Sequence, residues 1–227
     1  MKSGGTTMSL FSHNPTAFKS LLAERSNYRD TDYKTWLIDL KKPPGMLEIY
    51  AQHLFGAVMG QTFPALFVFE WLLNFYPVEQ IVEIGTGCGG LTVYLQTQAN
   101  IRGLDFVTYD ARMRLDDKNN KIMANKPVKL KEYINYRSAN VFDKDVRDEI
   151  RETLKKKVTL LYCDNGNKPK EMKTFVPYCL KGSIVGTHDW NGQFGIEGMI
   201  KELKMELLFE DICKEGMTKM RFWQKGA

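Results

Sequence analysis

The sequence predicts an α/β protein built on a doubly wound, mostly parallel sheet of seven strands, with an antiparallel C-terminal hairpin and an N-terminal helical cap. Two observations carry this expectation. From residue 77 onward, short apolar runs alternate with helical stretches, which is typical of a parallel sheet covered by helices on both faces. The last two strands are separated by a short turn, and such a pair must be antiparallel because parallel strands need a long crossover.

Each element has a local signal. The helix at 63–75 begins after Thr62 with a proline in its first turn, and it is apolar on nearly every face, so it must be buried. The helix at 143–156 is acidic at its start and basic at its end, as the helix dipole favours. Other helical patterns lie at 15–40, 46–59, 90–98, 112–124, 170–179 and 196–206. Strands are expected at 80–84, 104–109, 132–137, 158–163, 183–187, 207–212 and 218–224. We expect residues 1–76 to form the cap, a lid within the same globule, and 77–227 the sheet domain.

The composition is that of an ordinary folded chain. Of 227 residues, 43% are hydrophobic and 26% charged, which excludes a disordered protein and favours one large domain. The four cysteines are scattered without metal-binding spacing, which indicates a reduced, cytoplasmic protein. No apolar run reaches the roughly 18 residues that a membrane span needs, so we expect no membrane partner.

The net charge of +5 is unevenly spread. Residues 111–157 contain 14 basic and 8 acidic side chains. A local surplus of this size fits a solvated face, an anionic small molecule or RNA, and the solvated face is the commonest of these.

A glycine-rich segment directly follows the strand at 80–84 and precedes a helix. Its sequence, from Val82 to Gly90, is VEIGTGCGG. Glycines permit positive φ and let the backbone approach a ligand closely. In a doubly wound sheet, ligands bind beyond the carboxyl ends of the strands, where this loop lies. The loop also satisfies GxGxxG, so a dinucleotide-binding oxidoreductase is one alternative.

The pattern from Glu83 to Gly89, ExGxGxG, resembles motif I of the class I S-adenosylmethionine (SAM) dependent methyltransferases. The resemblance implies a Rossmann-like fold with SAM as the cofactor. It also implies that Asp110, which ends the next strand, receives the ribose hydroxyls, since a carboxylate offers two acceptor oxygens. The residues implied to bind the cofactor are Glu83, Gly85, Thr86, Gly87, Gly89, Asp110, Ala139, Asn140 and Asp164.

Two later strands end abruptly in polar residues, at Asp164 and at His188–Asp189. Neighbouring parallel strands lie about 4.8 Å apart, so the two carboxylates are expected to converge. Carboxylates so close repel unless a proton or cation lies between them. Oxygen ligands favour Mg²⁺, Ca²⁺ or Mn²⁺, and an imidazole shifts the preference toward Mn²⁺ or another transition metal.

This arrangement resembles the metal-dependent O-methyltransferases, both the catechol O-methyltransferase type and the cephalosporin-hydroxylase and rhamnosyl O-methyltransferase group. The resemblance implies that Asp164 and Asp189 bind the metal, and it includes the pair Gly60–Gln61. His188 departs from both patterns, although histidine can itself be a ligand. Lys168 is a weak candidate base. It lies four residues after Asp164, whereas the catechol enzymes carry their catalytic lysine three residues after the corresponding aspartate.

These features predict methyl transfer from SAM to a hydroxyl of a small molecule, assisted by Mg or Mn. Asp164, His188 and Lys168 are the expected catalytic residues. Alternatives are a non-catalytic or hydroxylase-like SAM-binding relative, and an RNA methyltransferase. The second is disfavoured because the strand before Asp164 does not lead into the Pro-Pro-aromatic motif of nucleic-acid amino methylases. Trp36, Tyr50, Trp190 and Phe194 are candidate pocket aromatics, and the N-terminal helices are a candidate homodimer interface.

Overall fold

The computed structural model describes residues 53–55, 57–112, 130–190, 195–215 and 218–226. All of them belong to one compact unit, Gly45–Ala227. The helical patterns predicted at 15–40 and over most of 112–124 lie outside the described residues, as do Trp36, Tyr50 and Phe194.

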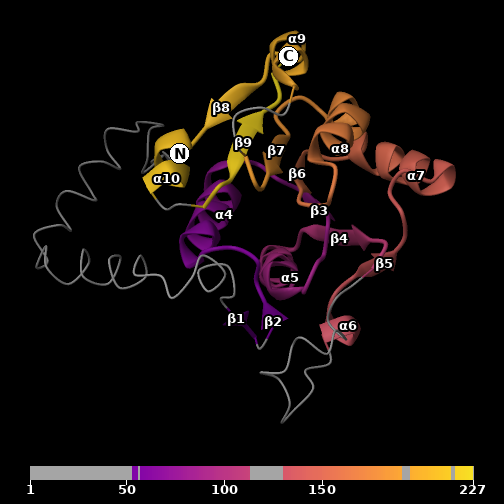
Figure 1. Cartoon of the computed structure of the whole chain (residues 1–227), viewed down its shortest axis with the longest axis vertical. Helices are drawn as coiled ribbons and strands as arrows, with labels where there is room; N and C mark the ends of the chain where they lie inside the picture. Colours follow the sequence, from indigo (N-terminus) through magenta and orange to yellow (C-terminus); the bar gives the residue numbers. More distant parts are fainter. Residues whose placement is uncertain (1–52, 56, 113–129, 191–194, 216–217, 227) are drawn as a thin grey trace, which may run out of the picture. The chain divides into compact units, whose positions relative to one another are not determined.

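A seven-stranded sheet forms the centre of the fold, in the order β5-β4-β3-β6-β7-β9-β8 (Figure 1). Among the described strands of this sheet, β9 alone runs against the others. The strands are β3 (Gln80–Ile84), β4 (Asp105–Asp110), β5 (Tyr136–Ser138), β6 (Thr159–Cys163), β7 (Ile184–Thr187), β8 (Glu206–Leu208) and β9 (Arg221–Gln224). The predicted α/β class, mostly parallel sheet and antiparallel C-terminal pair are confirmed.

Helices cover both faces of the sheet, and each face has its own apolar core. One core joins the sheet to α4 (Phe63–Phe75), α5 (Gly90–Arg102) and α10 (Glu210–Glu215). The other joins it to α7 (Lys144–Leu154), α8 (Lys168–Phe175) and α9 (Glu197–Glu202). Every residue of β3 and β6 is buried, as expected for strands covered by helices on both sides.

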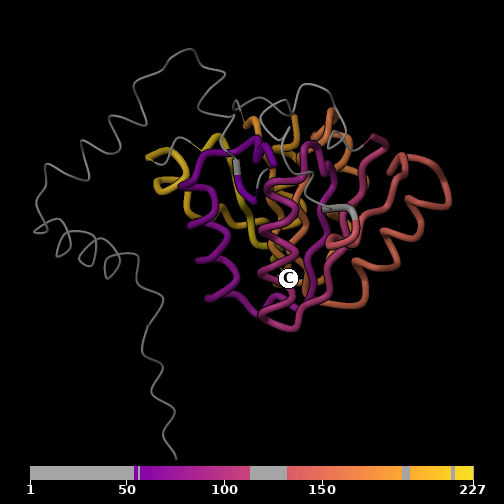
Figure 2. Tube along the Cα trace, turned by 90° about the horizontal axis from the view of Figure 1, so that it is seen from below, coloured from indigo at the N-terminus to yellow at the C-terminus, as the bar shows by residue number. Residues whose placement is uncertain are grey.

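Helix α4 is part of this packed body. Figure 2 shows α4 and α5 side by side, and Glu70 of α4 accepts hydrogen bonds from Gln98 and Arg102 of α5, both at 2.7 Å. Helix α5 is limited by two glycines in left-handed conformations, Gly89 (φ 85°) and Gly103 (φ 69°), so it extends past the predicted end at residue 98. Among the described helices, none combines the length and apolar character needed to cross a membrane.

Three predicted elements are wrong in part. The end of the predicted helix at 46–59 is instead a small hairpin, β1 (His53–Leu54) with β2 (Ala57–Val58), which packs its backbone against Gly90. The predicted strand at 132–137 begins as a helix, α6 (Leu130–Tyr133), and only its end pairs as β5. The predicted strand at 207–212 stops at Leu208, because Phe209 takes φ 55° and two acidic residues then start α10.

Helix α10 also changes how the last two strands are connected. This helix replaces the end of the strand predicted at 207–212 and the start of the predicted turn, so β8 and β9 are antiparallel neighbours without a tight hairpin between them. Because β9 lies between β7 and β8, it places residue 219, which precedes it, next to the end of β7. Smaller differences affect the bounds of α8, which begins at Lys168 and continues into a 3-10 turn (Val176–Tyr178), and of α9.

Candidate functional site

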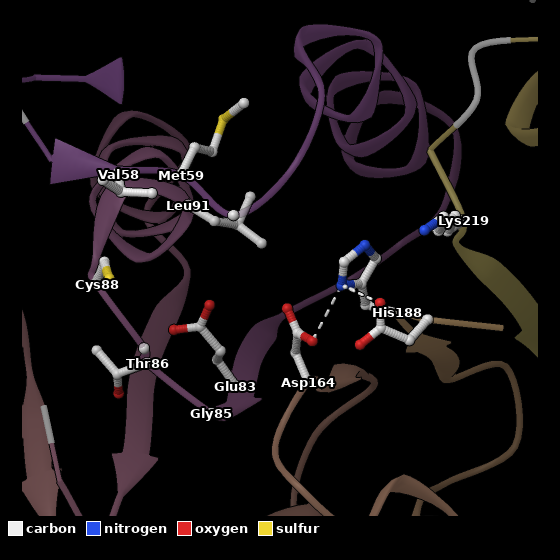
Figure 3. Close-up of a pocket in the computed structure, with 13 residues that line it drawn as sticks. Val58, Met59, Glu83, Gly85, Thr86, Cys88, Leu91, Asp164, His188 and Lys219 are labelled. Atoms are coloured by element: carbon white, nitrogen blue, oxygen red, sulfur yellow. Dashed lines mark ion pairs between the residues drawn. The ribbon is translucent and has the colours of Figure 1, made fainter. Parts of the chain in front are cut away.

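A cavity of about 360 Å³ lies at the carboxyl ends of β3, β6 and β7, within the size range of small-molecule sites. Figure 3 shows the carboxyl groups of Glu83 and Asp164 pointing into it, with Val58, Met59 and Leu91 across from them. The cavity is lined by Val58, Met59, Gly60, Glu83, Gly85, Thr86, Gly87, Cys88, Leu91, Asp164, His188, Asp189 and Lys219. The structure therefore brings the predicted glycine loop and the predicted strand ends together in one site.

Two of the four glycines in the glycine loop (residues 85–90) serve different purposes. Gly85 has φ 107°, and a Cβ there would come within 2.6 Å of the Asp164 backbone. Gly87 has φ 54°, but a Cβ there would meet nothing within 4 Å. Gly85 thus lets two strand ends approach each other, whereas Gly87 leaves open room beside the cavity.

Glu83 lies beneath the loop and is almost completely buried. Burial raises the pKa of its carboxyl group to about 8, although hydrogen bonds from Thr108 and Thr92 act in the opposite direction. Thr92 donates to Glu83 at 2.7 Å, and the hydroxyls of Thr86 and Thr108 are hydrogen bonded at 2.7 Å. At neutral pH Glu83 is therefore mainly protonated, and its carboxyl group can donate as well as accept a hydrogen bond.

Asp110 connects the end of β4 to the glycine loop. Its Oδ2 accepts a hydrogen bond from the Gly87 amide at 2.9 Å, and its Oδ1 accepts one from the Arg112 amide at 2.8 Å. The second bond is the local cap that an aspartate commonly makes after a strand. Each carboxylate oxygen has a further acceptor site, so this structural role leaves acceptor capacity for a ligand.

Ala139 and Asn140 follow β5 and do not line the cavity. The Asn140 side chain is engaged locally, since it donates to Asp143 at 3.0 Å and accepts from the Phe142 amide at 3.1 Å. Its side chain therefore shapes the turn before α7. The adenine-binding role implied for these two residues stays a prediction.

The strand-end trio, Asp164, His188 and Asp189, forms the polar end of the cavity. One potential ligand atom from each lies within 4.8 Å of the others. His188 Nδ1 is 3.3 Å from Asp164 Oδ1 and 3.5 Å from Asp189 Oδ1 (Figure 3). His188 is buried, whereas the Asp189 side chain is 58% exposed and its backbone takes φ 54°. The expected convergence of the two carboxylates is present.

Lys168 places a positive charge beside the two carboxylates of the trio. Its Nζ is 3.0 Å from Asp189 Oδ2 and 3.5 Å from Asp164 Oδ1. Burial works to lower the pKa of Lys168, but the two carboxylates outweigh it and raise the pKa above the ordinary value. Burial likewise works to raise the pKa of Asp189, but His188, Lys168 and Lys219 hold it below its usual range. At neutral pH the pair is thus an ammonium and a carboxylate.

Gln61 orients the first carboxylate of the trio. It is fully buried, and its Nε2 donates to Asp164 Oδ2 at 3.0 Å and to the Tyr162 hydroxyl at 3.2 Å. With Oδ2 engaged in this way, Asp164 turns Oδ1 toward His188. The sequence offered Gly60–Gln61 only through the family resemblance, and no local pattern indicates this contact.

Sequence reasoning did not identify Val58, Met59, Leu91 or Lys219 as cavity residues. The first two lie on the segment that was predicted to be helical, and they reach the site because β2 packs on the start of α5. Gly90 is the residue in the sequence that could have indicated this contact, since a Cβ there would come within 2.7 Å of Met59 Cα. Trp190, a predicted pocket wall, is half-buried and packs edge-on against Trp223, 5.1 Å between ring centroids.

Comparison with known proteins agrees at the level of the fold. No family model and no curated protein sequence matches the chain. An apo structure of CmcI is similar with a TM-score of 0.56 at 15% identity, over 82% of each chain. A complex of CmcI with Mg and SAM gives 0.55 at 15% identity, over 82% of this chain and 83% of that one. A structure described as a caffeoyl-CoA O-methyltransferase from Staphylococcus aureus gives 0.50 at 14% identity, over 92% and 100%.

The chain therefore has a Rossmann-like methyltransferase fold, as its strand order and these structures show. At 14–15% identity the comparison concerns the fold alone. The activity has to be argued from the residues of the cavity.

Proposed function

We propose that this chain is a SAM-dependent methyltransferase that transfers a methyl group to a hydroxyl of a small molecule with the assistance of a divalent metal. One observation carries the proposal: the glycine loop and the strand-end trio line the same cavity. The glycine loop lets the backbone approach a nucleoside cofactor closely, and the strand-end trio supplies donor atoms for a metal. Their adjacency supports a reaction between a cofactor and a metal-bound acceptor.

The cavity fits SAM through its backbone and its acids. Gly87 leaves room where any other residue would place a Cβ, and Asp110 retains acceptor capacity for ribose hydroxyls. Asp164, at the polar end of the cavity, offers carboxyl oxygens to the methionine end of SAM. Glu83, which is mainly neutral at pH 7, can orient a polar group without adding a second negative charge.

The donors of the trio fit a divalent metal. Two carboxylates and one imidazole, with ligand atoms within 4.8 Å of one another, suit Mn²⁺ or a transition metal, and the carboxylates alone suit Mg²⁺. A metal bound by Asp164, His188 and Asp189 would lower the pKa of an acceptor hydroxyl and orient it. The protein residues then position the reacting groups, which is the main requirement of an in-line methyl transfer.

The test measures the cofactor and the acceptor separately. We expect the wild-type chain to bind SAM in calorimetry and to form S-adenosylhomocysteine with a panel of hydroxylated small molecules, faster when Mn²⁺ or Mg²⁺ is added. Asp189→Ala should retain SAM binding and lose most of the metal-dependent rate. Asp145→Ala, at an exposed position on α7, is the matched control and should behave like the wild type. Unchanged metal dependence in Asp189→Ala would disprove the metal mechanism.

The alternatives give different results in the same assays. A non-catalytic relative binds SAM but forms no S-adenosylhomocysteine with any acceptor. An RNA methyltransferase binds RNA with an affinity that falls steeply as salt rises, because basic side chains replace counterions on phosphates. The lid role of residues 1–76 and the homodimer stay predictions, for which truncation and sedimentation experiments are the tests.

A further inference from the structure

We propose that Lys168 is the resident counter-cation of the strand-end trio, and that a divalent metal binds there in competition with its ammonium group. The inference rests on the metal-assisted function proposed above. It assigns Lys168 a role other than the proton acceptor that its sequence position suggests: the residue sets the affinity of the site for metal.

The ammonium group is held at three points. It contacts Asp189 Oδ2 at 3.0 Å and Asp164 Oδ1 at 3.5 Å, and it donates to the Asn165 carbonyl at 3.0 Å. Two of these contacts are hydrogen bonds, to Asp189 and Asn165, and the third is a longer ion pair with Asp164. Only 12% of the Lys168 side chain is exposed, so the group is a fixed part of the site rather than a solvated charge.

The local structure shows what holds this lysine in place. Lys168 is the first residue of α8, directly after the cap residue Asn167, whose side chain accepts from the Lys170 amide. A cation at the start of a helix is disfavoured by the helix dipole. The two carboxylates must therefore outweigh the dipole, and they hold the side chain over the loop that leads from β6 to α8.

Because of the same contacts, the Lys168 ammonium disfavours metal binding at the trio. Asp164 Oδ1 lies near both Lys168 Nζ, at 3.5 Å, and His188 Nδ1, at 3.3 Å, so a metal on this oxygen brings a second cation close to the ammonium. Like charges in a partly buried site repel strongly. Without metal, the ammonium offsets part of the repulsion between the carboxylates of Asp164 and Asp189. Lys168 thus stabilises the metal-free site and weakens the metal-bound one.

These opposite effects define the experiment. Binding of Mn²⁺ is measured by titration calorimetry, and the melting temperature is measured with and without Mn²⁺, on the full chain in the absence of SAM. Lys168→Met should lower the metal-free melting temperature yet bind Mn²⁺ at least tenfold more tightly than the wild type. Lys168→Arg, which keeps the charge, should resemble the wild type. Lys173→Met, an exposed lysine on the same helix, is the matched control and should change neither quantity.

A purely structural lysine would lower the melting temperature without tightening Mn²⁺ binding. If folded Lys168→Met binds Mn²⁺ no more tightly than the wild type, or if neither protein binds it, the proposal is overturned. If only Lys168→Met binds Mn²⁺ measurably, the proposal is supported. SAM binding by the wild type is recorded separately, so that failure of the proposed methyltransferase function is recognised independently of the metal comparison.

Discussion

At the scale of single residues, Gly85 joins the glycine loop to the strand-end trio. Its φ of 107° and a Cβ position 2.6 Å from the Asp164 backbone make any larger residue strained and crowded. We expect Gly85→Ala to reduce the free energy of unfolding by on the order of 2–3 kcal/mol, measured by urea denaturation. Gly87→Ala is the matched control: it has a positive φ but open space, so about 1 kcal/mol is expected. Equal losses would contradict this account of Gly85.

Glu83 gives the protein a pH dependence of stability. The folded carboxyl group has a pKa of about 8 against an ordinary value of 4.5, so between these values the folded state holds a proton that the unfolded state has lost. Stability therefore falls as pH rises from about 5 to 8, by on the order of 1 kcal/mol per pH unit from this residue. Below about pH 4.5 the penalty is absent, because both states are protonated.

The measurement compares the wild type with Glu83→Gln in urea denaturation at pH 5, 6, 7 and 8. Glutamine keeps the shape without the charge, so the variant should lose stability less steeply with pH. Glu171, whose pKa is raised by burial to about 7, contributes a slope of the same sign to both proteins and cancels in the comparison. Parallel curves for the two proteins would show that Glu83 is ionised in the folded state.

At the scale of elements, Lys225 secures the 3-10 turn that follows α8. Its Nζ donates to the carbonyls of Pro177 at 2.9 Å, Cys179 at 2.6 Å and Val176 at 3.2 Å. Removing the donor leaves these carbonyls less well satisfied, so we expect Lys225→Met to cost about 1–3 kcal/mol in urea denaturation. Lys181→Met, at an exposed position nearby, should remain within about 0.5 kcal/mol of the wild type. A similar loss in both variants would indicate a general effect of lost charge.

The elements that could be predicted are those whose buried positions produce a recognisable pattern of apolar residues in the sequence. Strands β3 and β6 are fully buried runs, and their predicted bounds agree with the structure within a residue. The elements that could not be predicted depend on single backbone angles or distant contacts. Phe209 and Lys219 take positive φ and shorten strands whose residues favour an extended backbone. A glycine at either position would have indicated a positive φ, but neither residue is a glycine. The hairpin at 53–58 exists because Gly90 admits it against α5.

The same distinction applies to the site. Asp164 and Asp189 were accessible to prediction because parallel strands bring their carboxyl ends to one edge of the sheet. The contacts of Gln61 and Lys168 with these residues were not, since each depends on how a side chain is oriented by packing. Lys219 was missed for another reason: β9 is inserted between β7 and β8, and the expected hairpin concealed this order.

At the scale of the whole molecule, the cavity joins the two halves of the sheet. The glycine loop follows β3, which continues toward β4 and β5, while the trio follows β6 and β7 on the other side. A ligand that contacts both groups binds only the folded chain, so it must stabilise the entire unit by mass action. At a ligand concentration one hundred times the dissociation constant, the gain is about 2.7 kcal/mol.

We therefore expect SAM to raise the melting temperature of the wild type in a concentration-dependent manner, and NAD at equal concentration to have no such effect. Asp110→Ala should reduce the SAM-induced shift, because it removes the acceptor predicted for the ribose hydroxyls. Ribose is common to SAM and NAD, so the contrast between the two ligands depends on the methionine end, which lies near Asp164 and Glu83 in this interpretation. A larger shift with NAD would favour the oxidoreductase that the GxGxxG pattern left open, since the fold alone accommodates both cofactors.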